Sequence, residues 1–359
     1  MRQPLTRLHA HRIAIVKPSA LGDIVHALPV LFALRTRFPD AHISWIVNTP
    51  LQPLLAGHPD LDATIGFDRA ALRGGVIRAM RYLARFTRQL RQARFDLVLD
   101  LQGLLRSGLM TWATAAPRRV GLAEAREGAR LCYTDLVAAG RMRDRHAVER
   151  NWRFAEALGV GDLPRRFDLP QHAAVRAALA ARLAGLPRPW LVVAVGSQRP
   201  TKRWPAASFA ALVRHAHQRG GGSAIFIGSA DETALARVVI DALPGVPTLD
   251  LSGRTSLPEL VELIRLADGV LANDTGPLHL AAALGRPVVA PYTCTLARLH
   301  GPYGPAGLVP GAVETNIWCK GSYRKRCGRL DCMTELQPAR LLPVLDEVLQ
   351  TWPSRCRSA

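Results

Sequence analysis

The chain has 359 residues, which exceeds one typical hydrophobic core and suits two domains of about 150 to 200 residues each. Apolar residues make up 48% of the sequence and charged residues 21%, a balance that is typical of globular proteins and excludes a disordered one. No run of about 18 apolar residues occurs, and the basic N-terminus lacks the apolar segment of a signal peptide. We therefore expect a cytoplasmic protein without a transmembrane helix.

The formal net charge of +19 favours a polyanionic partner, such as a nucleic acid, a membrane surface or a phosphorylated substrate. A composition biased toward arginine explains part of this charge, because all but four of the basic residues are arginine. Lysine is therefore informative where it occurs, at Lys17, Lys202, Lys320 and Lys325. We do not expect a nucleic-acid partner, because no recognition helix or RNA-binding signature accompanies the charge.

Short apolar runs alternate with longer amphipathic segments along the whole chain, which predicts parallel sheets built from βαβ units. In the first half, strands are expected at 12–16, 42–47, 63–67, 96–100 and 118–122, and helices at 23–38, 75–94 and 104–115. In the second half, strands are expected at 190–195, 223–227, 248–251, 269–272 and 287–292, and helices at 172–185, 206–219, 231–243, 257–267, 277–284 and 337–350.

A stretch rich in proline and arginine, residues 159–170, separates the two halves and is interpreted as a linker. The pattern predicts an α/β protein with two Rossmann-like, doubly wound domains that face a cleft. We expect the first domain to span residues 1–168 and the second, which binds a nucleotide, to span residues 169–336. The remaining residues, 337–359, form a helix and tail that packs back toward the first domain.

The loop after the first strand reads K-P-S-A-L-G-D-I-V-H, residues 17 to 26. Asp23 begins the next helix there and has two open interpretations. It is either a cap that accepts the free amides of the first turn or a general base kept ionised by the helix N-terminus. His26 lies three residues further on and is expected on the same helix face.

The loop after strand 269–272 reads N-D-T-G-P-L-H, and it predicts a phosphate site. Gly276 leaves the backbone amides accessible, and Pro277 suits the first position of a helix, so unpaired amides and the helix dipole favour an anion. Asp274, Thr275 and His279 are candidate contacts to the same ligand.

Two further loops supply polar groups to the second domain. Residues 195–205 offer Ser197, Gln198 and Lys202, and Glu232 follows strand 223–227, where it is either a ribose acceptor or a solvent-exposed acid. Together these groups suit a nucleoside diphosphate. The fingerprints of dinucleotide enzymes and of P-loop kinases are both missing from the sequence.

These motifs resemble those of the lipopolysaccharide heptosyltransferases, which are glycosyltransferases of the GT-B type. The resemblance spans nearly the whole chain. Besides the loops above, it rests on D-L-Q-G-L-L-R-S (100–107), H-A-V-E-R-N (146–151), T-K-R-W-P (201–205) and G-S-A-D-E (228–232).

The resemblance implies inverting transfer of a heptose from ADP-L-glycero-D-manno-heptose to the Kdo–lipid A region of lipopolysaccharide, with no cofactor. It implies that residues 1–168 bind the acceptor and that the protein lies peripherally at the cytoplasmic face of the inner membrane. Asp23 takes the place of the catalytic base. The implied donor contacts are Ser197, Gln198, Lys202, Glu232, Asp274, Thr275, Gly276 and His279, and the acceptor or cleft residues are Lys17, Ser19, Gly22, His26, Gln102, Arg81 and Arg85.

Some features depart from the family pattern. Ala20 and Gln198 stand where a hydroxyl residue is expected, and Ala20 removes one candidate phosphate contact. The first half is most like heptosyltransferase I, whereas the cysteine-bearing tail at 319–336 looks more like the second type. Cys319, Cys327 and Cys332 form an incomplete metal-ligand set, because Ser322 interrupts the C-x-x-C spacing, and we favour reduced structural cysteines with no bound metal.

Four arginines recur at helical spacing within 75–94, at Arg78, Arg81, Arg85 and Arg88. They are either a solvated helix face or a basic rim that meets an acidic glycolipid at the membrane. A related GT-B transferase with another sugar donor or another acceptor stays open, as does a sugar-nucleotide epimerase, which shares the phosphate loops.

Overall fold

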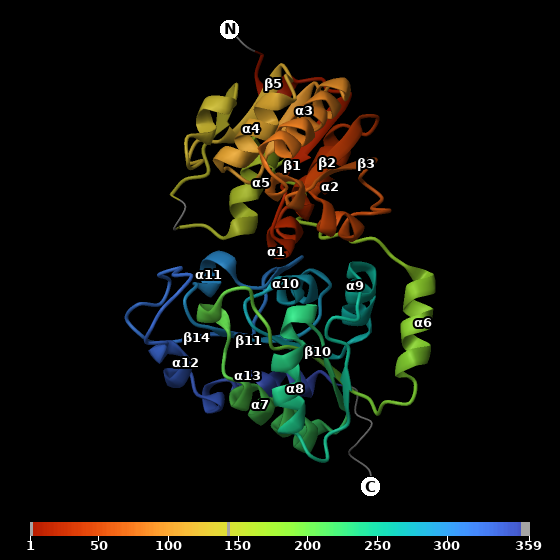
Figure 1. Ribbon diagram of the computed structural model, residues 1–359, viewed down its shortest axis with the longest axis vertical. Coiled ribbons are helices and arrows are strands. Elements are labelled where there is room, and N and C mark those ends of the chain that lie inside the picture. Colours follow the sequence, from red (N-terminus) through yellow and green to blue (C-terminus); the bar gives the residue numbers. More distant parts are fainter. Residues whose placement is uncertain (1–2, 142–143, 353–359) are drawn as a thin grey trace. The chain divides into compact units, whose positions relative to one another are not determined.

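The computed structural model describes residues 3–141 and 144–352 of the chain (Figure 1). The chain divides into two compact units, Met1–Gln171 and His172–Ala359. Each unit contains one six-stranded sheet with its own helices.

In the first unit, the strands are all parallel and pair in the order β3-β2-β1-β4-β5-β6. Their bounds are β1 Arg12–Val16, β2 His42–Asn48, β3 Ala63–Phe67, β4 Leu97–Asp100, β5 Arg118–Leu122 and β6 Asp135–Val137. The helices are α1 Leu21–Val25, α2 Leu28–Arg37, α3 Val76–Gln92, α4 Leu105–Ala113 and α5 Ala147–Ala157, with 3-10 turns η1 Leu5–Arg7, η2 Thr49–Leu54, η3 Ala70–Arg73 and η4 Ala129–Cys132.

The second unit repeats this order with β14-β11-β10-β7-β8-β9. Its strands are β7 Trp190–Ala194, β8 Ser223–Phe226, β9 Thr248–Asp250, β10 Gly269–Ala272, β11 Val288–Tyr292 and β14 Ala312–Glu314, with a small hairpin of β12 Tyr303–Gly304 and β13 Gly307–Leu308. Its helices are α6 Ala173–Leu183, α7 Ala206–Gly220, α8 Thr233–Asp241, α9 Leu257–Leu266, α10 Gly276–Ala283, α11 Ala297–His300, α12 Asp331–Glu335 and α13 Leu342–Gln350, with η5 Pro200–Lys202, η6 Ala230–Glu232 and η7 Pro338–Arg340.

The central strands are buried along almost their whole length, which explains their continuous apolar sequences. In β7 every residue of W-L-V-V-A is buried, and in β1 every residue after Arg12 is buried. Helices cover both faces of a doubly wound parallel sheet, so its strands have no solvent-facing side and lose the alternation of an antiparallel sheet.

Proline accounts for two differences from the expected helices. The segment 23–38 forms two helices, α1 and α2, because Pro29 has no N–H to continue the hydrogen bonding across residues 25–28. In the same way, the expected helix 337–350 is divided into η7 and α13, with Pro343 in the first turn of α13. Asp23 therefore lies in the first turn of α1, which begins at Leu21, and Ala20 is the capping residue.

The C-terminal helix α13 belongs to the core of the second unit, where it packs on α7 and β11. The sequence predicted that residues 337–359 form a segment separate from the second domain. For α13 this prediction was wrong, because Leu345, Val348 and Trp352 are buried in the apolar cluster of the second unit. The expected tail 353–359 lies outside the described residues. The strands and α-helices that the sequence did not predict are β6, α5, α11, α12, β14 and the β12–β13 hairpin; except for α5, these have five residues or fewer.

Both sheets reverse their strand order at one point, between β1 and β4 in the first unit and between β7 and β10 in the second. The loops that leave the carboxyl ends of two such strands diverge, and ligands bind doubly wound sheets at this point. Most of the expected site residues follow these strands, whereas Glu232 follows β8 and Arg81 and Arg85 lie on α3. Among the helices that the structure describes, none is long and apolar enough to cross a bilayer.

Candidate functional site

Asp23 lies in the first turn of α1, directly after β1. One of its carboxylate oxygens, Oδ2, accepts a hydrogen bond of 3.1 Å from the backbone N–H of Ala20. The side chain is half-buried, and its second oxygen, Oδ1, is left for another donor. The capping and catalytic interpretations are thus geometrically compatible, because the cap uses only one oxygen.

Lys17 directly follows β1 and is buried, with 6% of its surface exposed. Its ammonium donates a 2.7 Å hydrogen bond to the carbonyl of Leu101, the residue that follows β4. Burial lowers the pKa of Lys17, and the nearby carboxylates of Asp23 and Asp100 oppose that shift. Lys17 therefore joins the two loops at the switch point and lies close enough to Asp23 for their charges to interact.

Asp100 was not among the expected site residues, although it ends β4 beside this lysine. Its Oδ1 accepts the amides of Gln102 and Gly103 at 2.9 and 3.0 Å, and its Oδ2 accepts the hydroxyl of Tyr133 at 2.7 Å. Burial raises the pKa of Asp100 despite these hydrogen bonds. The carboxylate thus fixes the loop that carries Gln102.

His26 follows α1 and is buried, with its ring in edge-to-face contact with His146 at a centroid distance of 5.2 Å. His146 caps α5 by accepting the amide of Val148 at 3.2 Å, and Asn151 of α5 donates to the carbonyl of His26. The H-A-V-E-R-N motif therefore caps the start of α5 and contacts His26, the residue that follows α1. Its signal in the sequence was a cap residue followed by Glu149 in the first turn.

The remaining first-unit candidates fall in two places. Ser19 and Gly22 lie in the same loop and first turn as Asp23, and Gln102 lies in the loop after β4. Arg81 and Arg85 are exposed on α3 and line a groove of about 830 Å³.

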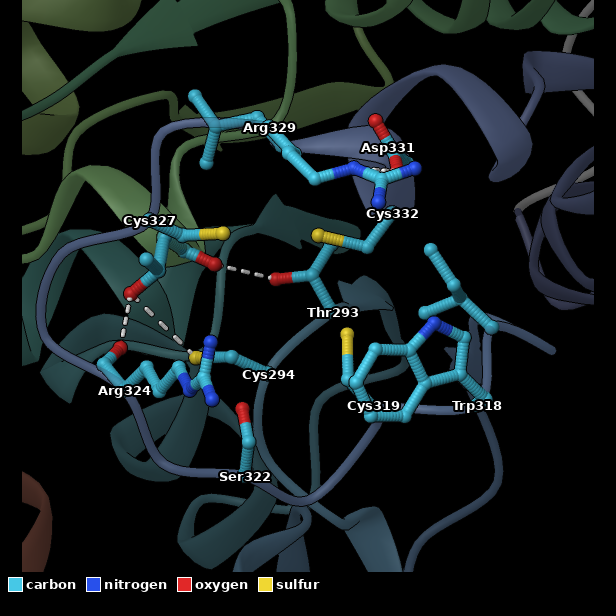
Figure 2. Close-up of a pocket in the computed structure, with 13 residues that line it drawn as sticks. Thr293, Cys294, Trp318, Cys319, Ser322, Arg324, Cys327, Arg329, Asp331 and Cys332 are labelled. Atoms are coloured by element: carbon cyan, nitrogen blue, oxygen red, sulfur yellow. Dashed lines mark hydrogen bonds and ion pairs between the residues drawn. The ribbon is translucent and has the colours of Figure 1, made fainter.

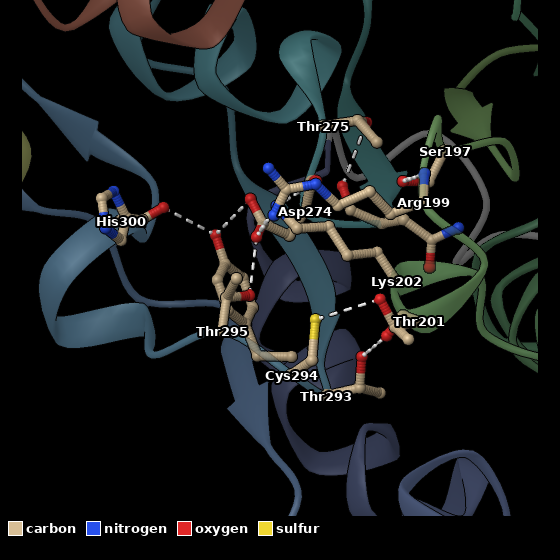
Figure 3. Close-up of polar contacts among 12 residues, drawn as sticks. Ser197, Arg199, Thr201, Lys202, Asp274, Thr275, Thr293, Cys294, Thr295 and His300 are labelled. Carbon is tan, nitrogen blue, oxygen red and sulfur yellow. Dashed lines mark hydrogen bonds and ion pairs between the residues drawn. The ribbon is translucent and has the colours of Figure 1, made fainter. Parts of the chain in front are cut away.

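In the second unit, an ion pair joins the loops that follow β7 and β10. The ammonium of Lys202 lies 2.5 Å from Oδ2 of Asp274 and 3.4 Å from that residue's carbonyl oxygen (Figure 3). An ammonium has three N–H donors, so one donor is left to a ligand after these two contacts. The pair thus connects the lysine to the start of α10.

Asp274 is 5% exposed and receives several further contacts. Thr295 donates to its Oδ2 at 2.7 Å, and the Nε2 atom of His279 lies 3.4 Å from Oδ1 (Figure 3 shows Asp274 and Thr295). Burial alone would raise the pKa of Asp274, but the hydrogen bond from His279 and the charge of Lys202 outweigh it and hold the pKa well below its ordinary value. Asp274 is therefore ionised near neutral pH, and its carboxylate holds Lys202 and His279 in place.

Helix α10 begins at Gly276, with Thr275 as its capping residue. Thr275 and Gly276 are half-exposed, and the first amides of a helix have no acceptor within the helix. The hydroxyl of Thr275 donates to the carbonyl of Asn273 at 3.1 Å, which holds the turn. The start of α10 beside Lys202 is therefore suited to a phosphate.

The other expected donor contacts surround this point. Ser197 is buried, and Gln198 is exposed to solvent. The carboxylate of Glu232 accepts the amide of Ser229 at 2.9 Å and packs directly against Gly196, where any Cβ would overlap it. Glycine at position 196 thus lets Glu232 approach the loop after β7.

Four cysteines line one cavity of about 60 Å³ next to this site. The sulfur atoms of Cys294, Cys319, Cys327 and Cys332 point into it (Figure 2). The sequence linked the last three but missed Cys294, which follows β11 and enters only through the fold. Burial raises the pKa of Cys332 to about 11. All five cysteines within the described ranges are free, and no His, Cys, Asp or Glu cluster there is arranged to hold a metal ion.

This cysteine cavity supports the turn that carries Lys202. The hydroxyl of Thr201 donates to the carbonyl of Arg324 at 2.7 Å, and Cys294 Sγ lies 3.5 Å from the same hydroxyl (Figure 3 shows the second contact). The hydroxyl of Thr293 donates to the carbonyl of Thr201 at 2.6 Å. The carbonyl of Arg324, in the 319–336 segment, and the residues after β11 therefore hold the turn that carries Lys202.

Two doubly wound parallel sheets with polar loops at each switch point define the GT-B class of fold. A solved structure of a family 9 glycosyl transferase from Veillonella parvula has the same fold, with a TM-score of 0.82 and 22% identity over 98% of this chain and 99% of that chain. The E. coli heptosyltransferase WaaC with ADP-2-deoxy-2-fluoro heptose matches with a TM-score of 0.70 and 23% identity over 94% of this chain and 99% of that chain.

The model of glycosyltransferase family 9 (heptosyltransferase) matches residues 83–328, so the chain belongs to this family and is a glycosyltransferase. Lipopolysaccharide heptosyltransferase 1 of Pseudomonas aeruginosa is 29% identical over 94% of this chain and 98% of its own length. Relatives named heptosyltransferase 2 match as well.

Proposed function

We propose that this protein is an inverting heptosyltransferase of the lipopolysaccharide core. It moves a heptose from ADP-L-glycero-D-manno-heptose to the Kdo–lipid A region. The names of its relatives support the reaction class, and the ADP-sugar analogue bound by WaaC supports the donor class. The observation that carries the proposal is the Lys202–Asp274 pair at the start of α10, which presents a fixed cation beside free helix amides.

The second unit binds the donor in this proposal. The diphosphate accepts hydrogen bonds from the amides at Thr275 and Gly276 and from the remaining donor of Lys202. Glu232, held beside Gly196, accepts hydrogen bonds from the ribose hydroxyls. Asp274 does not contact the anionic diphosphate, because its negative charge is committed to Lys202 and His279.

The first unit supplies the base. An acceptor hydroxyl attacks the anomeric carbon of the heptose while the bond from that carbon to the β-phosphate oxygen breaks, which inverts the configuration. Asp23 takes the hydroxyl proton through Oδ1, because Oδ2 accepts the amide of Ala20. The departing ADP carries away the negative charge, and Lys202 with the α10 amides stabilises it.

The reaction is tested by incubating the protein with ADP-heptose, with and without a deacylated Kdo-containing acceptor. We expect ADP release and an acceptor heavier by one heptose, measured by mass spectrometry. An ADP-heptose whose sugar is altered when no acceptor is present would instead indicate an epimerase. No turnover with either acceptor condition would contradict the proposal.

The type of heptosyltransferase is settled by the acceptor. The first unit favours the type I acceptor, Kdo, through the D-L-Q-G-L and H-A-V-E-R segments. The alternative is a type II acceptor, which the cysteine-bearing segment 319–336 favours, or another sugar donor. A panel of both acceptors with several nucleotide sugars distinguishes these cases, because only the cognate pair gives full turnover.

The proposed acceptor is anchored by lipid A, so the proposed place of action is the cytoplasmic face of the inner membrane. A protein that meets a bilayer without a membrane-spanning segment needs a surface for it.

A further inference from the structure

Helix α3 of the first unit has three different faces. One face, with Tyr82, Phe86 and Leu90, packs on the sheet, where Phe86 contacts Phe67 at a ring-centroid distance of 5.1 Å. The two other faces are open to solvent, and they differ from each other in chemistry.

The first open face is apolar. Val76, Met80 and Leu83 follow helical spacing and are exposed by 76%, 65% and 44%, and Ile77 beside them is exposed by 69%. A helix that only covers a sheet directs its apolar residues inward and polar residues outward. The apolar side chains on this open face therefore have no partner in the first unit's core.

Exposed apolar side chains also occur on α4, which lies beside α3 in the fold, and on η4. Leu105, Leu109 and Trp112 form an exposed stripe on α4, and Leu131 of η4 is 91% exposed. Helix α4 packs against both α3 and η4 (Figure 1 shows α3 and α4 side by side). Most of the large apolar side chains exposed in the described residues lie on these three elements. We call this surface, from Val76 to Leu131, the α3–α4 face.

The second open face of α3 is basic. Arg78, Arg81 and Arg85 line the groove at the start of the helix, and Arg88 continues the row. The sequence of α3 contains five arginines and no acidic residue. An apolar stripe beside a row of arginines on one helix is the arrangement of interfacial helices that bind anionic bilayers.

We propose that the α3–α4 face docks on the surface of an anionic phospholipid bilayer. The apolar side chains enter the boundary between headgroups and acyl chains, and the arginines bind lipid phosphates. The choice of a bilayer over a protein partner follows from this charge and rests on the proposed function, whose acceptor is held in a membrane. The sequence showed only the arginines; the exposed apolar stripe appears only in the fold.

The test measures co-flotation of the full chain with vesicles of phosphatidylcholine, with or without phosphatidylglycerol. We expect binding that needs phosphatidylglycerol and weakens with salt.

The triple variant Met80→Ser, Leu83→Ser, Leu109→Ser should lower the partition constant at least about tenfold, because it removes apolar area that enters the bilayer. Arg88→Glu should lower it too. Val238→Ser, which alters a similarly exposed side chain on α8, is the matched control and should not change binding.

A second measurement locates the face. Fluorescence quenching by bromine-labelled lipids should fall in Trp112→Phe, because Trp112 lies on the proposed docking surface. Absence of vesicle binding, or equal binding to neutral vesicles at any salt concentration, overturns the proposal. So does a dimer that the triple variant dissociates, since the apolar face would then bind a second copy.

Failure of the docking proposal can be distinguished from failure of the proposed transfer reaction. The triple variant should transfer heptose to the water-soluble deacylated acceptor at the wild-type rate while losing activity on the acceptor embedded in vesicles. Loss of turnover on the soluble acceptor as well, with an unchanged melting temperature, would count against a docking role for these side chains.

Discussion

The ammonium of Lys202 lies 2.5 Å from Oδ2 of Asp274, although the two residues are 72 positions apart in the chain. One follows β7 and the other follows β10, neighbouring strands at the point where the sheet order reverses. This pair connects the loop 195–205, which carries Lys202, to the start of α10.

Lys202→Ala should weaken ADP binding by roughly 10- to 100-fold, because it removes a charged hydrogen bond to the diphosphate. Isothermal titration calorimetry with ADP measures this. Lys320→Ala is the matched control, since Lys320 also pairs with a carboxylate, that of Glu314, in the same unit. Equal loss of affinity in both variants would show that the effect is one of net charge alone.

Asp274→Asn should lower both ADP affinity and stability, because it removes the partner of a largely buried ammonium. We expect a loss of about 1–3 kcal/mol in the free energy of unfolding near neutral pH. The folded pKa of Asp274 is below its ordinary value of 3.8, so its stabilisation is present above that value and is lost as the pH falls toward the folded pKa.

Urea unfolding of the wild type and Asp274→Asn at a series of pH values tests this dependence. The difference between the two proteins should be constant from neutral pH down to about pH 5 and should shrink below about pH 4. A difference that grew with acidification would contradict the assigned charge state.

Asp23→Asn should reduce kcat by about 10²- to 10⁴-fold while leaving ADP affinity unchanged. The asparagine retains an oxygen that accepts the amide of Ala20, so the start of α1 is preserved and only the base is removed. Single-turnover kinetics with the deacylated acceptor measure the loss. A rate near that of the wild type would remove Asp23 from the mechanism and leave it as a helix-capping residue.

Gly196→Ala should displace the carboxylate of Glu232, because the new Cβ would occupy its position. We expect weaker ADP binding with little change in affinity for inorganic pyrophosphate, which has no ribose. Gly185→Ala is the control, since nothing lies within 4 Å of a Cβ there. An equal loss of affinity for ADP and for pyrophosphate would indicate that Glu232 affects binding of the phosphates and not of the ribose.

Thr201→Val should loosen the turn that carries Lys202, because it removes the hydroxyl bonded to Arg324 and Cys294. Hydrogen exchange should accelerate at 200–202 and in the cysteine-bearing segment, with a loss of about 1 kcal/mol in local stability and weaker ADP binding. Thr351→Val removes a similar hydroxyl bond, to Val348, far along the chain. If both variants bind ADP like the wild type, the cysteine cavity does not support the donor site.

The strands of both sheets could be predicted closely, because a buried parallel strand is a continuous apolar run with a turn at each end. β1, β3, β5 and β10 have the expected bounds. The short edge strands β6 and β14 were missed, since three residues carry no periodic signal. The polar loops after β1, β7, β8 and β10 could be identified because each contains glycine and charged residues directly after an apolar run.

Which of these residues meet was decided by tertiary structure. The sequence named Lys202 and Asp274 as separate donor contacts, and only the pairing of β7 with β10 makes them an ion pair. Cys294 reaches the other three cysteines, and Asp100 reaches Tyr133, through the same kind of long-range packing. The apolar stripe on α3 resembles an inward-facing helix pattern in the sequence, because periodicity gives spacing but not which face the sheet covers. The local residue order thus determined the strands and loops. The order of the strands, which depends on the burial of whole sheets, determined which of the loop residues come together in the site.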